Sequence, residues 1–489
     1  MYPPFREYRR KKVTKMTQEM KAVDTQVTPK QFAIYAAIVV AIAFLCYWWL
    51  RDMHQTLAAT IFLALVVGTL MFWRYRVAIA FVGMAILLLT RTMDLKHAIE
   101  FMSLDVIVFL IGMMVVVALL RETGFFSWLG IKIIKLAKYN PRRIMISLLF
   151  LSAIMAACVD EVTSILFMTA LVFELCACYK INPVNYVISV VLATNIGSSW
   201  TVLGNPIGIL LALRAGLTFE DFMRWSFPVG LGGLICLVAI ILVWQRRDLK
   251  LLNTKIAAQL ESGSCALDEW AEVKDRTFFY GGIALFLGVV IFLALHYRLE
   301  LLFGLEKNTL LVATSVTGAG IAMLWKRAKA REYLERGVDW WTLIFFMFLF
   351  SKAGCLAYTS VTDKIAGAAT GLTASPVVLT IIIALGAAFG SAAMDNVVLV
   401  AAVIPVVRAL GAAGVYNFPI WWALLLGGCY GGNITMVGST ANIVALGMLE
   451  KRTGYRMTLR KWILVGLAGG LLPLCVAQVL LLVQLPIMP

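Results

Sequence analysis

Three acidic side chains lie in the middle of two long apolar stretches of this chain. Asp160 and Glu161 fall within residues 143–177, and Asp395 falls within residues 376–411. A carboxylate at membrane depth is costly, so it is normally paired, protonated or bound to a cation. Because competition between a proton and a metal ion for one carboxylate gives antiport directly, these residues are candidates for ion binding and coupling.

The two aspartates also have a structural interpretation. Asp160 and Asp395 could each cap the second arm of a helical hairpin by accepting backbone N–H groups, as N-terminal aspartates commonly do. Capping and ion binding are compatible roles for one side chain. Glu161 faces a different side from Asp160, and its counterpart in the second stretch is Asn396.

Two glycine-rich stretches supply neutral polar groups. They read Gly197-Ser-Ser-Trp-Thr-Val-Leu-Gly-Asn-Pro206 and Gly431-Gly-Asn-Ile-Thr-Met-Val-Gly-Ser-Thr440. Glycine permits non-helical backbone and close approach of a ligand. A helix that unwinds in mid-membrane exposes carbonyl groups at one half-helix end and N–H groups at the other. We therefore expect a broken helix at each stretch, although glycine and serine would also allow simple close packing of helices.

The expected substrate ligands are neutral polar residues and glycines from the hairpins and the broken helices. They are Thr163, Ser164, Asn195, Gly197, Thr201, Gly204, Asn205, Asn396, Asn433, Thr435, Gly438, Ser439 and Asn442.

These landmarks occur twice along the chain. Asp160 and Asp395 are 235 residues apart, and Asp105 and Asp339, which precede apolar runs, are 234 apart. Two halves built alike, with paired interruptions of their hydrophobic segments, are typical of secondary transporters and indicate where the substrate binds.

The composition places the chain in a lipid bilayer. Hydrophobic residues make up 61% of it, charged residues only 14%, and the mean hydropathy is +0.88. The apolar stretches are long enough to span hydrocarbon. We predict an all-α polytopic membrane protein with about 11 transmembrane segments in two inverted repeats, each containing a re-entrant hairpin and a broken helix.

The expected organisation follows the apolar and polar stretches in order. It comprises a cytoplasmic N-terminal segment (1–31), scaffold helices (32–99), a first repeat (100–245) with hairpin 143–177 and broken helix 185–214, a cytoplasmic linker (246–276), scaffold helices (277–338), and a second repeat (339–485) with hairpin 376–411 and broken helix 419–449.

The net charge of +16 reports orientation rather than a nucleic-acid surface. With the N-terminus inside, about 33 of the 43 Lys and Arg residues fall on the inner side, which is the positive-inside bias. This threading places the C-terminus outside and opposes the directions of segments 104–121 and 340–359, so the repeats would be inverted. We expect membrane lipid as a partner, and no nucleic acid.

The motifs resemble those of the ion transporter superfamily. Cys158-Val-Asp-Glu-Val-Thr-Ser-Ile-Leu166 and Ala193-Thr-Asn-Ile-Gly197 are similar to the first hairpin tip and broken helix of the arsenite permease, NhaD-type sodium/proton antiporter and P-protein branch. Ser391-Ala-Ala-Met-Asp-Asn396 and Gly431-Gly-Asn433 match the second half of that pattern. The resemblance covers both hairpins and both broken helices, and therefore most of the chain.

The chain departs from the family pattern at two places. Asn205-Pro-Ile-Gly208 stands where Asp-Pro-Pro-Asn is common, and Glu161 stands where Asn is usual. The sodium/dicarboxylate symporters of the same superfamily carry Ser-Asn-Thr at both tips, where this chain has acidic residues. Added negative charge disfavours a dianion by Coulomb repulsion at low dielectric.

The resemblance implies a mobile unit of hairpins and broken helices that moves in an elevator-like way against a scaffold, in a homodimer. We predict a secondary active transporter of a small inorganic ion or arsenite-like metalloid, coupled to H+ or Na+. Alternatives are a sodium/proton antiporter, a sodium-coupled carboxylate or anion symporter, and a passive channel. The nine cysteines and three histidines show no metal-site spacing, and no nucleophile–base pairing indicates an enzyme, so we expect no cofactor besides the coupling ion.

Overall fold

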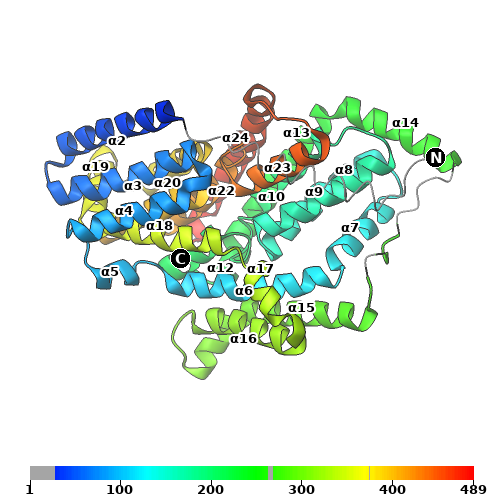
Figure 1. The fold of residues 1–489 in the computed structure, drawn as a ribbon, viewed down its shortest axis with the longest axis horizontal. Helices are drawn as coiled ribbons and strands as arrows, with labels where there is room; N and C mark the ends of the chain where they lie inside the picture. The colour runs from blue at the N-terminus through cyan, green and yellow to red at the C-terminus, as the bar shows by residue number, and fades with distance from the viewer. Residues whose placement is uncertain (1–27, 263–267, 272, 374) are drawn as a thin grey trace.

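The computed structural model describes residues 28–489, except 263–267, 272 and 374 (Figure 1). Helices are the only regular secondary structure in this part of the chain. Ten of them are long and apolar enough to cross a membrane, or eleven if the bent pair Thr309–Trp325 and Arg327–Gly337 is counted as one span. The predicted all-α membrane fold is therefore confirmed, whereas most of the expected N-terminal segment (1–31) lies outside the described residues.

The helices of the first half follow one another with short connections. They are α2 (Pro29–Leu50), α3 (Met53–Met71), α4 (Arg76–Leu89), α5 (Leu95–Glu100), α6 (Leu104–Glu122), α7 (Phe125–Leu136), α8 (Pro141–Cys158), α9 (Glu161–Cys178), α10 (Val184–Gly197), α11 (Pro206–Ala215), α12 (Phe219–Asp221) and α13 (Phe227–Trp244).

From α18 on, the second half repeats the order of the long helices that begins with α6 in the first half. Its helices are α14 (Arg246–Ser262), α15 (Arg276–Phe303), α16 (Thr309–Trp325), α17 (Ala330–Gly337), α18 (Trp340–Tyr358), α19 (Val361–Leu372), α20 (Pro376–Ala393), α21 (Asn396–Ala412), α22 (Phe418–Gly431), α23 (Thr440–Thr453) and α24 (Leu459–Gln484).

The starts of equivalent helices keep a nearly constant separation. It is 236 residues for α6 and α18, 235 for α8 and α20, and 234 for α10 and α22. The repeat seen in the sequence is therefore a repeat of helix order. The opposite orientation of the two halves in a membrane stays a prediction.

Each hairpin packs closely against the broken helix of its own half. The first arm α8 packs on α10, and α20 packs on α22. A Cβ on Gly197 would lie 2.2 Å from the Ala153 carbonyl oxygen, and one on Gly431 would lie 2.3 Å from that of Ala388. Only glycine permits such an approach of two backbones, so these two positions fix how each hairpin sits on its broken helix.

The two halves also interlock. The second hairpin arm α9 packs on α23 of the other half, and α21 packs in the same way on α11. We call helices α8–α11 and α20–α23 the core unit. The remaining long helices lie outside this core unit. Among them, α6 contacts α15, α16 and α17, and α18 contacts α3, α4 and α5.

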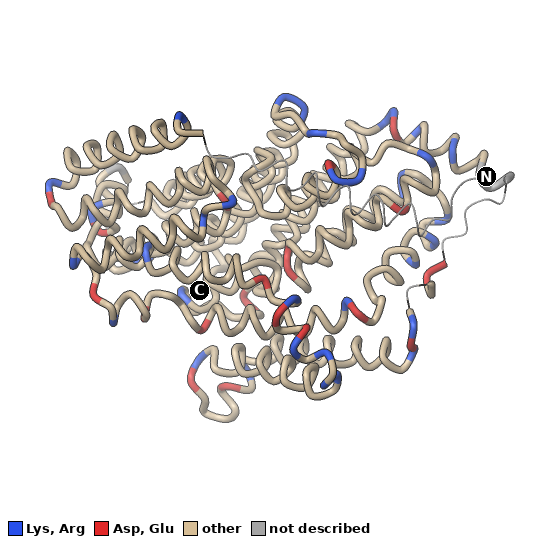
Figure 2. Tube along the Cα trace, viewed as in Figure 1, with Lys and Arg blue, Asp and Glu red and all other residues tan. Residues whose placement is uncertain are grey.

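Charged residues lie mainly at helix ends and in connections, whereas most helix interiors carry none (Figure 2). Helices α5 and α19 lie at one end of the long axis, and α7 and α14 lie at the other (Figure 1). Helix α14 occupies the first part of the expected linker 246–276, and Leu249, Leu252 and Ile256 on it are buried. Because this segment is mostly polar, its sequence gives little sign of the short apolar face of α14.

Inversion of the repeats predicts opposite accessibility for two lysines. Lys180 follows α9 and is exposed, and exposed Lys364 lies on α19, where its Nζ donates to the Leu50 carbonyl at 2.6 Å. In a chain whose native cysteines have been replaced, we expect Lys180→Cys to react with an impermeant thiol reagent only from the cytoplasmic side. Lys364→Cys should react only from the outside. Labelling of both positions from one side would rule out the inverted arrangement.

Candidate functional site

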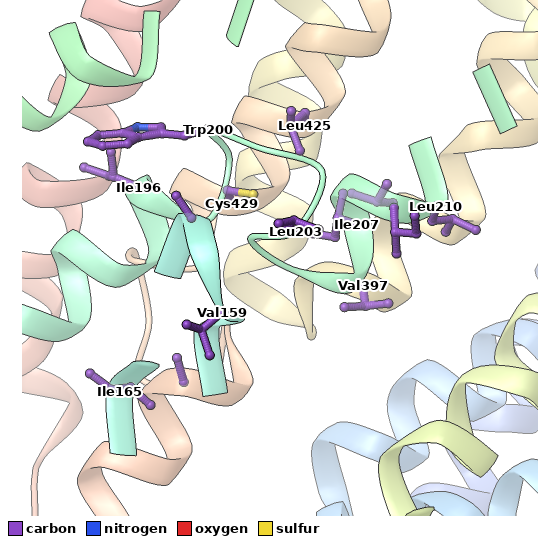
Figure 3. Packing of buried hydrophobic residues seen from close by; sticks show 14 of the residues in the cluster. Val159, Ile165, Ile196, Trp200, Leu203, Ile207, Leu210, Val397, Leu425 and Cys429 are labelled. Carbon is purple, nitrogen blue, oxygen red and sulfur yellow. The ribbon is translucent and has the colours of Figure 1, made fainter. Parts of the chain in front are cut away.

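Non-helical segments interrupt both broken helices at equivalent places. Residues 198–205 separate α10 from α11, and residues 432–439 separate α22 from α23. Figure 3 shows Trp200 and Leu203 of the first segment close to Cys429 of α22. These interruptions occur where the glycine-rich stretches predict them.

Two threonines attach the interruptions to the hairpins. The Thr201 hydroxyl donates to the Ala157 carbonyl, and the Thr435 hydroxyl donates to the Ala392 carbonyl at 2.6 Å. The Thr201 oxygen also accepts the Leu203 N–H at 3.1 Å, and Thr435 makes the equivalent contact two residues on. Because each hydroxyl already has a donor and an acceptor partner, these threonines hold the backbone in place.

Asn205 and Ser439 occupy equivalent positions and cap the second half-helices. The Asn205 Oδ1 accepts the Gly208 N–H at 2.8 Å, and the Ser439 Oγ accepts the Ala441 N–H at 3.1 Å. The Asn205 Nδ2 also donates to Ser198 Oγ at 3.0 Å and to Cys429 Sγ at 3.1 Å. Asn205 thus links the two halves.

Three buried asparagines form a second link. The Asn195 Nδ2 donates to Asn433 Oδ1 at 2.8 Å and to Asn442 Oδ1 at 2.9 Å. The Asn442 Nδ2 donates to the carbonyls of Gly432 and Thr435 at 2.7 and 2.8 Å. The Asn195 Oδ1 is buried and has no hydrogen-bond partner among the described residues.

Both tip aspartates cap the second hairpin arms. The Asp160 Oδ1 accepts the N–H groups of Val162 and Thr163 at 2.9 and 2.8 Å, and the Asp395 Oδ1 accepts the Val397 N–H at 3.0 Å. The backbone of Asp160 has φ 145° and ψ 158°, a region that is open essentially to glycine alone. The capping interpretation therefore holds geometrically, and Asp160 is held in a strained conformation at the tip.

The second carboxylate oxygen of Asp395, which takes no part in the cap, faces the second broken helix. Its Oδ2 accepts the Thr440 hydroxyl at 2.7 Å, and the side chain is 3% exposed. Asp395 therefore contacts a hairpin and a broken helix at once.

Glu161 lies where the two halves meet. Its Oε2 is 3.5 Å from the Nδ2 of Asn396, which is the equivalent residue of the other half. It also interacts with the Ser439 side chain and, electrostatically, with Asp395. Glu161 is 2% exposed and Asn396 is fully buried, and the Asn396 Oδ1 has no hydrogen-bond partner within the described chain. The second residue of each tip thus meets its counterpart.

One basic group lies near the tips. Arg76, at the start of α4, is buried and donates to the Thr342 hydroxyl at 2.8 Å. Its guanidinium also interacts electrostatically with Asp395 and Asp339. No basic residue is among those that the sequence selects, so Arg76 is an addition to the candidate site.

The structure brings together most of the residues that the sequence selects. Glu161, Asn396 and Ser439 make direct contacts, and Asp395 lies beside them. The Thr163 side chain bonds to Asp160. Ser164 instead donates to the Ser152 carbonyl at 3.4 Å and faces the other arm of its own hairpin.

The sequence analysis missed Cys429 and Ser198. Cys429 lies 234 residues after Asn195, and both contact an amide of the opposite half. The 234-residue spacing of the repeat could have revealed Cys429. Arg76 left no such signal, because it begins a distant helix.

The arrangement is rich in acceptor oxygens. Three carboxyl groups and two unpaired amide oxygens lie around the hairpin tips and broken helices. No group of three His, Cys, Asp or Glu residues suited to a metal ion occurs in the described part of the chain. Such a site can hold a proton, a hard monovalent cation or a neutral hydroxylated species.

A cavity of about 420 Å³ separates the core unit from the surrounding helices. Its walls come from α5, α18 and α19 on one side and from α11 and α21 on the other. Arg214 and Arg408 line it, and Arg214 Nη2 lies 3.1 Å from Asp105 Oδ1. Glu100 and Asp363 also line the cavity, so its charge is mixed.

Comparison with known proteins gives consistent results. The family model described as citrate transporter matches residues 63–427. An uncharacterized transporter of Mycobacterium bovis is 36% identical over 356 residues, covering 71% of this chain and 78% of the relative. The human P protein is 25% identical over 522 residues, covering 91% of this chain and 58% of its own length.

A solved structure is also similar. The YdaH transporter of Alcanivorax borkumensis has a TM-score of 0.47 and 17% sequence identity, over 78% of this chain and 85% of that one.

Proposed function

The chain belongs to the citrate transporter family and is a secondary transporter, and we propose that it moves a small inorganic ion or metalloid coupled to H+ or Na+. The membership also confirms the resemblance to the ion transporter superfamily that the hairpin motifs indicate. Substrate and coupling ion are inferred below from the site itself.

The observation that carries the proposal is the environment of Glu161. This carboxyl group is buried between the two halves, and its polar neighbours, its hydrogen-bond donor Asn396 and the Ser439 hydroxyl, are neutral. Neither partner neutralises a negative charge, so the group is protonated or bound to a cation. Gain and loss of that proton or cation would change the charge at the junction of the halves, which supports a coupling role.

The preferred substrate is an uncharged metalloid hydroxide such as arsenite in its neutral form. Such a molecule needs donors and acceptors rather than a fixed countercharge. The amide oxygens of Asn195 and Asn396 have no donor among the residues that the structure describes, and each could accept a substrate hydroxyl. The carboxyl groups would accept the remaining hydroxyls.

Sodium/proton antiport is the second candidate. The same amide oxygens, together with Glu161, are hard oxygen ligands of the kind that alkali cations prefer. A cation bound to Glu161 would compete with its proton, and this competition gives antiport without a third species.

A carboxylate or anion symporter is the third candidate. The family description names citrate, and Arg214 and Arg408 line the cavity beside the core unit. Against it stand the acidic residues Asp160, Glu161 and Asp395 at the tips, because any ionised carboxylate among them repels a polyanion.

Elevator-like movement is supported by the position of the tips. Asp395 interacts electrostatically with Arg76, the first residue of α4. The tip therefore lies beside the end of a neighbouring helix. Sliding of the core unit along these helices would carry the site toward the other surface.

Proteoliposomes with defined gradients test the proposal. We expect accumulation of arsenite or sodium inside the vesicles against its own gradient when an opposing proton or sodium gradient is imposed. Accumulation of succinate or citrate instead would favour the symporter, and equilibration without accumulation would identify a channel and overturn the proposal.

Neutralising the tip aspartates should separate coupling from folding. Asparagine caps helices about as well as aspartate, so Asp160→Asn and Asp395→Asn should change the free energy of unfolding by less than roughly 1–2 kcal/mol. We expect the double variant to fold but to lose pH-dependent coupled transport, measured as initial rates across a pH series. Unchanged pH dependence would show that neither aspartate carries the coupling ion.

A further inference from the structure

A basic cavity lies where α13 meets α14 and α8 begins. Its volume is about 850 Å³. Arg142 comes from the start of α8, Val243 from the end of α13, and Arg246 and Lys250 from α14. The other lining residues are neutral: Asn140, Pro141, Leu242, Leu249 and Asn253.

No acidic residue in the described part of the chain neutralises the positive charge of this cavity. Arg142, Arg246 and Lys250 form no salt bridge with any residue that the structure describes. Asp248 lies between the two α14 cations in sequence but turns away, since its Oδ2 accepts the Asn185 Nδ2 at 2.7 Å. Three cations that converge without an acid favour an anionic ligand, and phosphate groups suit both guanidinium and ammonium donors.

Helix α14 has the form of a helix that lies on a membrane surface. Leu249, Leu252 and Ile256 are buried against the protein, whereas Arg246 and Lys250 are exposed. Figure 2 shows Lys and Arg along α14 at the right-hand end of the molecule, next to the start of α8. Because α14 directly follows a candidate membrane span, its exposed cations are expected near the level of the lipid headgroups.

An apolar surface continues from the cavity along α13. Val243 lines the cavity and is 57% exposed, and Ile235, two turns earlier on the helix, is 56% exposed. A ligand that fits both features is anionic at one end and apolar at the other. A free anion would leave the apolar surface without a partner.

We propose that this basic cavity binds the phosphodiester headgroup of an anionic phospholipid, with the acyl chains along the exposed side of α13. Basic pockets between membrane helices commonly bind such headgroups. Because α8 is the first arm of a hairpin, the bound lipid would join the core unit to α14. This site is independent of the identity of the transported substrate.

Titration of a short-chain phosphatidylglycerol into the purified protein in neutral detergent tests the proposal, with binding read from the rise in unfolding temperature. Arg246→Gln/Lys250→Gln should weaken binding roughly 20-fold, because each basic residue near a headgroup contributes about fivefold. Arg142→Gln alone should weaken it about fivefold, because it removes the contact from the other helix. All three side chains are exposed, so folding should be retained.

A matched variant on the same helix provides the control. Arg247→Gln/Lys255→Gln removes the same charge from residues outside the lining and should change binding by less than about twofold, because charges that do not contact the headgroup are screened by salt. Equal weakening in both double variants would overturn the proposal in favour of general electrostatic attraction. Equal stabilisation by phosphatidylcholine of the same chain length, or by inorganic phosphate, would likewise overturn a specific anionic-lipid site.

Discussion

Gly204→Ala and Gly438→Ala are each expected to abolish transport while leaving membrane insertion intact. A Cβ on Gly204 would lie 2.3 Å from the Ser198 carbonyl oxygen, and one on Gly438 would lie 2.7 Å from that of Ser391. These obstacles are backbone atoms, so the interruption itself would have to move. Overpacking of this kind costs about 1–3 kcal/mol, and it acts where Asn205, Ser439 and Thr435 are positioned. Initial transport rates and unfolding temperatures measure both effects.

Gly447→Ala is the matched control for this pair. A Cβ at Gly447 meets no atom within 4 Å, and the residue lies inside helix α23. Alanine in a helix interior is more stable than glycine by roughly 0.5–1 kcal/mol, so this variant should transport normally and unfold at a slightly higher temperature. Normal transport in both Gly204→Ala and Gly438→Ala would show that the glycines serve only to pack helices.

The sequence predicts the fold class and the broken helices because they depend on local composition and on spacing. An acidic residue in an apolar run must be shielded from lipid, and a glycine-rich interruption that occurs twice at one spacing indicates a repeated unit. Asp160 and Asp395 lie at the tips for these reasons. The resemblance adds the order of hairpins and broken helices, which composition alone leaves open.

The partners within the site could not be predicted, because they depend on how the halves interlock. Thr201 and Thr435 are polar residues in an interruption, which makes them appear to be substrate ligands. The structure shows that each holds a hairpin carbonyl. Nothing local to either threonine distinguishes the two roles.

Glu161 is another residue whose partners could not be predicted from the sequence. Its position in an apolar run makes it a candidate coupling residue, but the sequence does not show which residues it contacts. Interlocking of α9 with α23 turns this residue toward the other half, where it meets Asn396 and Ser439. One half therefore contributes an acid and the other an amide at equivalent positions, so the paired tips can carry one titratable charge at the junction.

Glu161→Gln is expected to remove the coupling of transport to the ion gradient. Glutamine keeps the shape of the side chain and can still bond to Asn396 and Ser439, but it cannot exchange a proton or balance a cation. Loss of coupling should reduce the effect of the coupling ion on substrate affinity by about 5- to 150-fold, the usual range for coupled sites. Substrate affinity measured with and without the coupling ion, sodium or protons, tests this directly.

Stability separates this effect from misfolding. Glutamine resembles a protonated glutamic acid in shape and in hydrogen bonding, so the unfolding temperature of Glu161→Gln should not fall. Glu220→Gln, at an exposed carboxylate that pairs with Arg298, is the control and should retain full coupling. If Glu161→Gln retained the ion dependence of substrate binding, the coupling group would have to be Asp160 or Asp395. If it unfolded at a markedly lower temperature, Glu161 would be an ionised structural residue whose charge the protein requires.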